Sequence, residues 1–407
     1  MMINVIGMGY IGLPTALMLG ACGNAVVGTD RNANLINLLK GGKISHNEPG
    51  LKSLFRKAIR NNIEFDMEPI NADIYIVAVP TPYNSLNKKI NAEYVVDATK
   101  SILEVCKSDA IIVIESTVSP GTIHKYLSPL VDKKNEKTLH TVRLAHAPER
   151  IIPGKIIYEL THNSRVIGTD DEEIGQRIAS LYKTFCKGDM IITSIKTAEM
   201  VKVVENTYRD VNIAFANELL KICKEGNLDV YEVIRIANMH PRVNILNPGP
   251  GVGGHCISVD PWFLVGDYPG LTNIILTARL INDSMPGFVL KRIHELMVEH
   301  NIKSSQKVGL YGITYKENVN DTRESPTLRL LQRMEESLAS GIKVFDPMIK
   351  EKIVDNQYLE FHRFLDDIDI IVIMVGHEHI IKNRELISNK IVLDTRNALN
   401  GINRYLL

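Results

Sequence analysis

Short apolar runs alternate with helix-like segments over the first third of the chain. Four of these runs end at glycine, proline or polar residues, and they lie at residues 3–9, 25–30, 73–82 and 110–120. Runs of this length, rich in valine and isoleucine, are typical of buried strands. Their alternation with helices predicts a parallel sheet covered on both faces, which binds ligands at the carboxyl ends of its strands.

A long helix is predicted in the middle of the chain, from about Lys196 to Glu225. Thr193 and Ser194 precede it as N-cap candidates, and Gly226 follows it as a C-terminal stop. At ~1.5 Å per residue the helix is about 45 Å long. That length suits a rod that joins two domains or packs against a second subunit.

Strand-like runs resume in the last third of the chain, at residues 306–314, 342–347, 367–376 and 390–396. Helical stretches separate them, which predicts a second, smaller α/β domain. No apolar run reaches the ~18 residues that a membrane span needs, and the N-terminus enters a strand without the pattern of a signal peptide.

A glycine-rich turn follows the first predicted strand. Gly7, Gly9 and Gly12 have the spacing of a dinucleotide-binding turn, and Asp30 closes the second strand 18 residues beyond Gly12. A carboxylate there can accept hydrogen bonds from a ribose diol and repel a 2′-phosphate, which favours NAD over NADP. Arg31 can instead accept that phosphate, and a plain glycine turn is the structural alternative.

Two threonines lie at later strand ends of the same predicted sheet. Thr81 belongs to VPTP and Thr117 to ESTVSP. At the carboxyl edge of the sheet their side chains would line the cofactor cleft. The alternative is that both are ordinary turn or cap residues.

Three polar residues share one face of the long helix. Lys202, Asn206 and Arg209 fall at i, i+4 and i+7. Such a trio is usually a solvated stripe, but the neighbouring residues are apolar and asparagine is a poor helix-interior residue. A lysine in such surroundings can carry a proton or stabilise an oxyanion.

Charge and cysteine content exclude several classes of protein. The chain has 47 basic and 47 acidic residues, so its formal net charge is zero. Without a basic block, neither nucleic acid nor an anionic membrane is expected as a partner. The five cysteines are scattered without a C-x-x-C pair, so we expect no disulfide framework, no metal site and a cytoplasmic location.

Cys256 lies in the pliable stretch PGPGVGGHCISVDPWF, residues 248–263. The alternative is that Cys256 is a buried cysteine with a purely structural role. A thiol becomes useful when an enzyme oxidises an alcohol beyond the aldehyde, because it captures the aldehyde as a thiohemiacetal and the second oxidation yields a thioester. Asp260 can then position the hydrolytic water. An oxidation that stops at the first step has no use for this thiol.

Seven segments resemble the nucleotide-sugar 6-dehydrogenase family, which includes the UDP-glucose and GDP-mannose dehydrogenases. In chain order they are GMGYIGLP, VAVPTP, ESTVSPGT, APERIIPG, TAEMVKVVENTYRDVNIAFANEL, HPRVNILNPGPGVGGHCISVDPWF and YKENVNDTRESP. Together they span essentially the whole chain. The sixth segment is most similar to the branch that acts on UDP-N-acetyl-D-mannosamine.

The resemblance implies two Rossmann-like doubly wound domains joined by a long central helix. It implies an NAD-binding domain at 1–190, a central helical dimerisation region with the cysteine loop at 191–300, and a UDP-sugar-binding domain at 301–407. The expected reaction is the four-electron oxidation of the sugar C6 hydroxyl to a uronate for a surface polysaccharide, with two NAD reduced in turn. A homodimer or a dimer of dimers is expected.

The same resemblance implies the site residues. The catalytic set has Cys256 as nucleophile, Lys202 as general acid/base or oxyanion stabiliser, and the further members Asn206, Asp260, Glu149 and Thr117. The cofactor set is Gly7, Gly9, Tyr10, Ile11, Gly12, Asp30, Thr81, Thr117 and Arg323. The substrate set is Arg150, Ile151, Lys202, Asn206, Arg209, His240, Arg242, Gly253, Tyr315, Lys316 and Arg396. In relatives the equivalent of Arg242 often comes from the neighbouring subunit, and Arg323 contacts the cofactor across domains or subunits.

Alternatives remain at this stage. Within the family, the substrate can be UDP-N-acetylglucosamine or UDP-glucose, which differ from the mannosamine sugar by one group or its orientation. Outside it, a two-electron hydroxyacid dehydrogenase shares the glycine turn and a helical lysine. A non-catalytic nucleotide-sugar-binding protein is the third alternative. From local sequence alone, Arg323 can pair with Asp321 or Glu324, His240 can be a turn residue, and Arg396 can cap a strand end.

Overall fold

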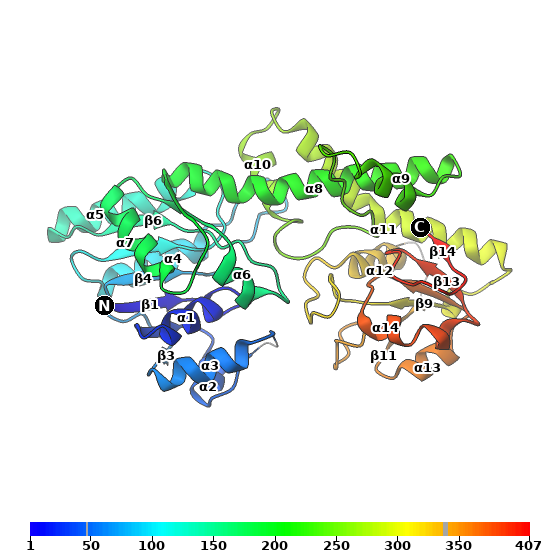
Figure 1. Ribbon diagram of the computed structural model, residues 1–407, viewed down its shortest axis with the longest axis horizontal. Helices are drawn as coiled ribbons and strands as arrows, with labels where there is room; N and C mark the ends of the chain where they lie inside the picture. The colour runs from blue at the N-terminus through cyan, green and yellow to red at the C-terminus, as the bar shows by residue number, and fades with distance from the viewer. Residues whose placement is uncertain (46–47, 337–340) are drawn as a thin grey trace. The chain divides into compact units, whose positions relative to one another are not determined.

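The computed structural model describes residues 1–45, 48–336 and 341–407. The chain forms two compact units, Met1–Glu205 and Asn206–Leu407. Each unit contains its own sheet, and helix α8 (Ile195–Glu225) begins in the first unit and ends in the second (Figure 1). The predicted fold class, two α/β domains joined by a long central helix, is confirmed. The three-domain division with boundaries at residues 190 and 300 stays a prediction.

The first unit has an eight-stranded sheet in the order β3-β2-β1-β4-β5-β6-β7-β8. Its strands are β1 (Met2–Ile6), β2 (Ala25–Thr29), β3 (Glu64–Asp66), β4 (Ile74–Val77), β5 (Ile111–Ile114), β6 (Arg143–His146), β7 (Arg165–Gly168) and β8 (Met190–Thr193). Its helices are α1 (Gly12–Ala21), α2 (Ala33–Lys40), α3 (Leu51–Arg60), α4 (Glu93–Val105), the π-helical η1 (Ile123–Leu127), α5 (Ser128–Thr138), α6 (Ile156–His162) and α7 (Glu172–Lys183).

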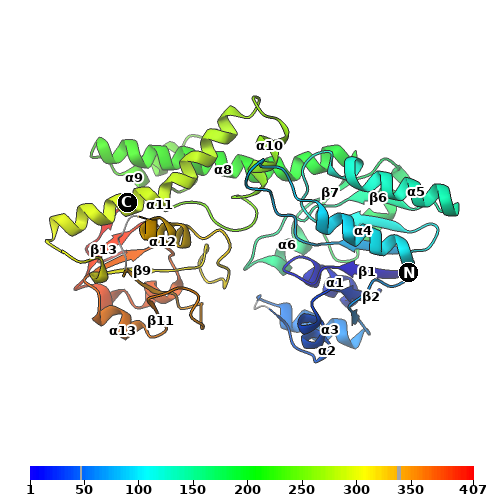
Figure 2. The ribbon, with the colours of Figure 1, turned by 180° about the vertical axis from the view of Figure 1, so that it is seen from behind.

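Alternate residues of the central strands enter two separate cores. In β4, Ile74 and Ile76 pack in the core with α1, α3 and α7, whereas Tyr75 and Val77 pack in the core with α4 and α5. Successive side chains of a strand point to opposite faces, so an unbroken apolar run needs helices on both sides. Figure 2 shows the first sheet from behind, with α4 and α5 labelled.

One strand pair departs from the predicted parallel sheet. β6 and β7 meet in antiparallel orientation through His146 and Gly168, while the other pairs described in this sheet are parallel. A contact of one residue pair has no periodic pattern, so the sequence carries no signal for its direction.

Helix α8 begins and ends close to the predicted positions. Ser194 caps its N-terminus, because the Thr197 amide donates to the Ser194 hydroxyl at 3.2 Å. At the other end Asn227, rather than Gly226, takes the left-handed conformation with φ 52°. The Leu228 amide then donates to the Cys223 carbonyl at 2.8 Å, which satisfies one of the last helical carbonyls.

The second unit has a six-stranded parallel sheet in the order β11-β10-β9-β12-β13-β14. Its strands are β9 (Val308–Tyr311), β10 (Lys343–Phe345), β11 (Gln357–Tyr358), β12 (Ile370–Ile373), β13 (Ile391–Asp394) and β14 (Tyr405–Leu406). Its helices are α9 (Val230–Ala237), α10 (Asp260–Asp267), α11 (Asn273–Glu299), α12 (Pro326–Glu336), α13 (Phe361–Asp366), α14 (Glu378–Lys382) and the 3₁₀ turns η2 (Ser305–Lys307) and η3 (Arg384–Ile387).

A buried arginine joins α8 to α11 within the second unit. The Arg279 side chain is 0% exposed, and its guanidinium lies 2.6 Å from the equally buried carboxylate of Asp210. The guanidinium also pairs with Asp283 on its own helix, and Asp283 pairs in turn with Arg329 of α12. Asn282 donates to Asp210 at 2.8 Å. These contacts fix the polar part of the interface between the two long helices.

Among the residues with described positions, no helix has both the length and the apolar character to cross a membrane. Nor does any cluster of three or more His, Cys, Asp or Glu within residues 1–45, 48–336 and 341–407 have the arrangement of a metal site.

Candidate active site

The glycine turn between β1 and α1 is built by close backbone contacts. Gly7 has φ 95°, and a Cβ there would lie 2.5 Å from the Ala78 carbonyl oxygen. A Cβ on Gly12 would lie 1.8 Å from the Gly7 carbonyl oxygen, so only glycine allows α1 to start this close to β1. A Cβ on Gly9 would meet nothing within 4 Å. Gly9 therefore leaves open space beside the helix N-terminus, as a pyrophosphate requires. Tyr10 and Ile11 are half-buried in the same turn.

Asp30 has a second role that the sequence did not reveal. One carboxylate oxygen accepts from the Met8 amide at 2.8 Å, and the other accepts from the Asn32 amide at 2.9 Å. The carboxylate thus joins the end of β2 to the glycine turn. A ribose diol that binds to Asp30 would therefore donate to a carboxylate that also holds the glycine turn in place.

The two predicted threonines lie together at the carboxyl edge of the first sheet. The Thr81 hydroxyl donates to the Thr117 carbonyl at 2.6 Å, and the Ser116 hydroxyl donates to the Val79 carbonyl at 2.7 Å. These bonds tie the loop after β4 to the loop after β5. The Thr117 side chain is half-buried at this edge, beside the strand ends where such sheets bind ligands.

Lys202 and Glu149 form a buried ion pair in the first unit. The Lys202 ammonium lies 3.7 Å from a Glu149 carboxylate oxygen, and each side chain is only 5% exposed. The other Glu149 oxygen accepts from the Ile151 amide at 2.6 Å. A buried charge is costly unless it is paired, so the pairing compensates the burial of both groups.

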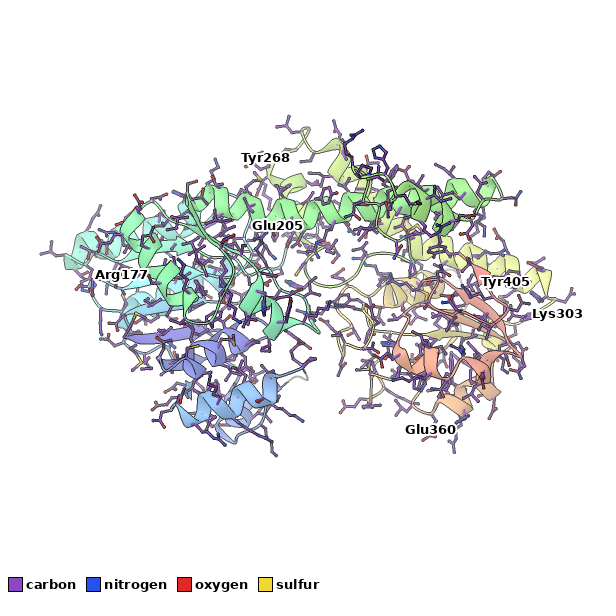
Figure 3. The ribbon with its side chains drawn as sticks, viewed as in Figure 1. Arg177, Glu205, Tyr268, Lys303, Glu360 and Tyr405 are labelled. Carbon is purple, nitrogen blue, oxygen red and sulfur yellow. The ribbon has the colours of Figure 1, made fainter. Side chains whose placement is uncertain are left out.

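Arg150 contacts α8 one turn further along from Lys202. Its guanidinium pairs with Glu205, which Figure 3 labels, and donates to the Ser164 carbonyl at 2.9 Å. Arg150 and Ile151 were both predicted to bind substrate. In the structure both belong to the segment that also supplies Glu149.

His146 is a buried group that the sequence analysis did not single out. Its Nδ1 lies 2.8 Å from the Ile114 carbonyl oxygen, so Nδ1 carries the proton in the neutral ring. Burial and, to a smaller extent, the Lys202 charge lower the pKa of His146 to about 3, although the hydrogen bond to Ile114 opposes this. The imidazole is therefore neutral near pH 7 and adds no positive charge beside Lys202. Its signal in the sequence is its place just before APER, at the end of a buried strand.

Asn206 connects two predicted site residues in the second unit. Its amide nitrogen donates to the Asp260 carboxylate, and its amide oxygen accepts from Arg209. Asn206 is 0% exposed and Asp260 is 3% exposed. Because Lys202 lies one turn before Asn206 on α8, the predicted polar face of this helix consists of buried or half-buried groups rather than a solvated stripe.

The cysteine loop leads directly into α10. Cys256 is half-buried, and its carbonyl accepts from the amides of Val259 at 3.1 Å and Asp260 at 2.9 Å. The thiol-bearing residue and the carboxylate that starts α10 are thereby held in one turn. Asn206 fastens this turn to α8 through Asp260.

The glycines of this loop permit contact with the loop after β9. A Cβ on Gly253 would lie 2.7 Å from both the Tyr315 Cβ and the Glu324 carbonyl oxygen. Gly254 has φ 84°, and a Cβ there would lie 2.8 Å from the Tyr315 ring. The Gly254 amide donates to the Arg323 carbonyl at 2.9 Å. The glycines therefore serve close packing against Tyr315 as well as turning the chain.

The remaining predicted substrate and cofactor residues occupy distinct places in the second unit. Arg323 makes a two-pronged contact with Asp321, the local pairing that the sequence offered as an alternative. Arg396 follows β13, donates to the Met374 carbonyl at 3.2 Å and lies against Gly249 of the cysteine loop. Lys316 follows Tyr315 in the loop after β9.

His240 and Arg242 lie on an exposed turn after α9. The Arg242 amide donates to His240 Nδ1 at 3.3 Å. The turn described here is thus local, and the expected role of Arg242 toward a neighbouring subunit stays a prediction.

Comparison with known protein families gives three matches in chain order. The NAD binding domain of the UDP-glucose/GDP-mannose dehydrogenase family matches residues 1–186, the central domain matches 196–284, and the UDP binding domain matches 309–401. These matches place an NAD-binding and a UDP-binding domain in the chain.

Individual relatives are similar over nearly the whole length. The UDP-N-acetyl-D-mannosamine dehydrogenase of Methanocaldococcus jannaschii is 43% identical, over 98% of this chain and 92% of its own. The NDP-N-acetyl-D-galactosaminuronic acid dehydrogenase of Ralstonia nicotianae is 37% identical, over 97% and 95%. The solved structure of UDP-D-ManNAc dehydrogenase from Pyrococcus horikoshii has a TM-score of 0.92 and 34% identity, covering 100% of this chain and 99% of its own. The chain therefore belongs to the UDP-glucose/GDP-mannose dehydrogenase family and is an NAD-dependent UDP-sugar dehydrogenase.

Proposed function

We propose that the substrate is UDP-N-acetyl-D-mannosamine and that its C6 hydroxyl is oxidised to a carboxylate, giving UDP-N-acetyl-D-mannosaminuronate. The observation that carries this proposal is the similarity, over nearly the whole chain, to relatives named for that sugar. The cysteine loop supports oxidation beyond the aldehyde, since it holds a half-buried thiol and a buried carboxylate in one turn.

In the proposed mechanism, Cys256 acts between two oxidations. The glycine turn and Asp30 would hold NAD, which would supply a hydride acceptor for each oxidation. Lys202 donates or accepts the proton of the reacting oxygen, and its pairing with Glu149 holds the ammonium group in place. The Cys256 sulfur adds to the aldehyde carbon to form a thiohemiacetal, and loss of the second hydride leaves a thioester. Water attacks the thioester carbon, the C–S bond breaks, and the thiol is restored as the carboxylate leaves.

Asn206, Asp260 and Thr117 orient the reacting groups in this proposal. Asn206 anchors Asp260, and Asp260 orients the hydrolytic water or takes its proton. Thr117, in the loop after β5, would support the nicotinamide. Tyr315, Lys316, Arg396 and the other members of the predicted substrate set bind the UDP-sugar.

The proposal is tested by the stoichiometry of NAD reduction. The purified protein is incubated with NAD and, separately, with the UDP forms of N-acetylmannosamine, N-acetylglucosamine, N-acetylgalactosamine and glucose. We expect two NADH per sugar consumed and the highest kcat/KM with UDP-N-acetyl-D-mannosamine. One NADH per sugar would indicate a two-electron dehydrogenase, and none a binding protein. Preference for the galactosamine sugar would support the second candidate, which the Ralstonia relative favours.

We also propose that the chain forms a homodimer, or a dimer of dimers, through α8. Large apolar side chains are exposed along this helix, at Val204, Tyr208, Phe215 and Ile222, and the isolated chain leaves them in water. Light scattering is expected to give two or four times the 45.6 kDa mass of one chain, and a monomeric mass would contradict this. The free cysteines suit the cytoplasm, which cell fractionation tests.

A further inference from the structure

A histidine and an aspartate are completely buried at the carboxyl edge of the second sheet. Asp346 follows β10 and His377 follows β12, and both side chains are 0% exposed. His377 Nδ1 accepts from the Asn318 amide at 2.9 Å, so the ring proton lies on Nε2. Nε2 faces the Asp346 carboxylate at 3.4 Å and the Thr314 hydroxyl at 3.2 Å.

The Asp346 carboxylate accepts hydrogen bonds from three backbone amides. One oxygen accepts from the amides of Ile313 at 2.6 Å and Thr314 at 2.9 Å, and the other accepts from the Met348 amide at 2.7 Å. Burial raises the pKa of Asp346, but His377 and the amide donors outweigh it, so the pKa lies below its usual value. The carboxylate is therefore ionised and holds the start of the loop after β9.

Asn318 is held at the other end of the same loop. It has a left-handed backbone with φ 58°, and its side-chain oxygen accepts from the Glu378 amide at 3.0 Å. His377 and Glu378 thus bind Asn318 through its amide and its side chain. Loss of the His377 acceptor would remove the hydrogen bond that holds the Asn318 amide, and this end of the loop would be released.

The loop fixed in this way carries Tyr315 and Lys316. The Tyr315 amide donates to the Asp321 carbonyl at 3.0 Å, and its side chain packs against Gly253 and Gly254, before Cys256. A buried polar pair is weak evidence for stability in itself, and its value can lie in fixing one geometry. Here the pair fixes the conformation of a loop that carries two residues predicted to bind the UDP-sugar.

We propose that Asp346 and His377 are positioning residues for the UDP portion of the substrate. They act by fixing residues 313–318 and make no contact with the substrate themselves. The proposal rests on the proposed function only for the identity of the sugar, because a UDP binding domain is matched at residues 309–401.

Two substitutions of His377 by amide side chains test the roles of its two ring nitrogens separately. In His377→Asn the amide oxygen can take the place of Nδ1 and accept from the Asn318 amide. In His377→Gln the longer amide reaches toward the Nε2 position and keeps only the Asp346 side. The exposed neighbour Glu378, which pairs with Lys382 at the surface, supplies the control variant Glu378→Gln.

The test measures UDP affinity by calorimetry, together with the thermal midpoint and the affinity for NADH. We expect His377→Gln to weaken UDP binding about tenfold, the effect of one lost hydrogen bond, and His377→Asn to stay within about threefold of the parent. NADH affinity stays unchanged in both variants, and Glu378→Gln matches the parent. Where a UDP-sugar is turned over, its KM follows the same order while kcat and the KM for NAD stay constant.

Equal UDP affinity in the two amide variants, or the reverse order, would overturn the proposal. So would a parallel loss of UDP and NADH affinity, or failure of both variants to fold, since the pair would then be a general structural requirement. Because UDP itself is the probe, the proposed function can fail with every sugar in the NADH assay while this order of affinities still holds.

Discussion

Replacement of Cys256 by serine is expected to abolish uronate formation, with a fall in acid production of about 10³-fold or more. The hydroxyl is a far weaker nucleophile than a thiolate, so the aldehyde is not captured and the thioester does not form. UDP-sugar affinity should stay within about twofold of the parent, because the substitution exchanges one atom in a loop held by backbone bonds. Acid is measured by chromatography, and binding by calorimetry.

Cys22→Ser is the matched control for this prediction. Cys22 is exposed at the end of α1, where its thiol donates to the Thr184 carbonyl at 3.3 Å. That variant should retain full activity. Normal uronate production by Cys256→Ser, or loss of UDP-sugar binding with normal turnover of what remains bound, would contradict the nucleophile role.

Replacement of Arg279 by methionine is expected to destabilise the second unit by about 3–5 kcal/mol, the usual cost of removing one partner from a buried ion pair. Asp210 would keep the hydrogen bond from Asn282 but lose its fully buried counter-charge. Asp283 would lose one of its two arginine partners. The free energy of unfolding is measured by denaturant titration followed by circular dichroism.

Lys291→Met provides the control on the same helix. Lys291 is 74% exposed and pairs with Glu295 at the surface, so its loss should change the free energy of unfolding by less than about 1 kcal/mol. The double variant Asp210→Asn/Arg279→Met should recover part of the lost stability, since it leaves no uncompensated charge. A cost for Arg279→Met no larger than that of Lys291→Met would show that the buried pair does not hold α8 and α11 together.

The glycine turn and the long helix were predictable because their signals are local. A fixed spacing of Gly7, Gly9 and Gly12 after an apolar run specifies a turn, and a capped apolar stretch specifies α8. The shortest strands, β11 and β14, have two residues each and leave no period to detect. Asn227 took the position expected for Gly226 because asparagine also tolerates the left-handed conformation.

The buried polar pairs could not be predicted from the sequence, for a different reason. Asp346 and His377 follow different strands, and Asp210 and Arg279 lie on different helices. Each pair forms only when the parallel sheet or the helix pair brings distant segments together. The place of His146 before APER marks a strand end, but nothing local shows that its ring is buried and neutral. In contrast, Lys202, Asn206 and Arg209 were found because helical periodicity alone puts them on one face.

The dual engagement of Asp30 limits how dinucleotide preference can change in this protein. Replacing the Asp30 carboxylate by a side chain that binds the 2′-phosphate of NADP also removes the acceptor of the Met8 amide. Coenzyme selectivity and the conformation of the glycine turn thus depend on the same residue. During evolution, a change of preference to NADP would need a second, compensating substitution near the turn.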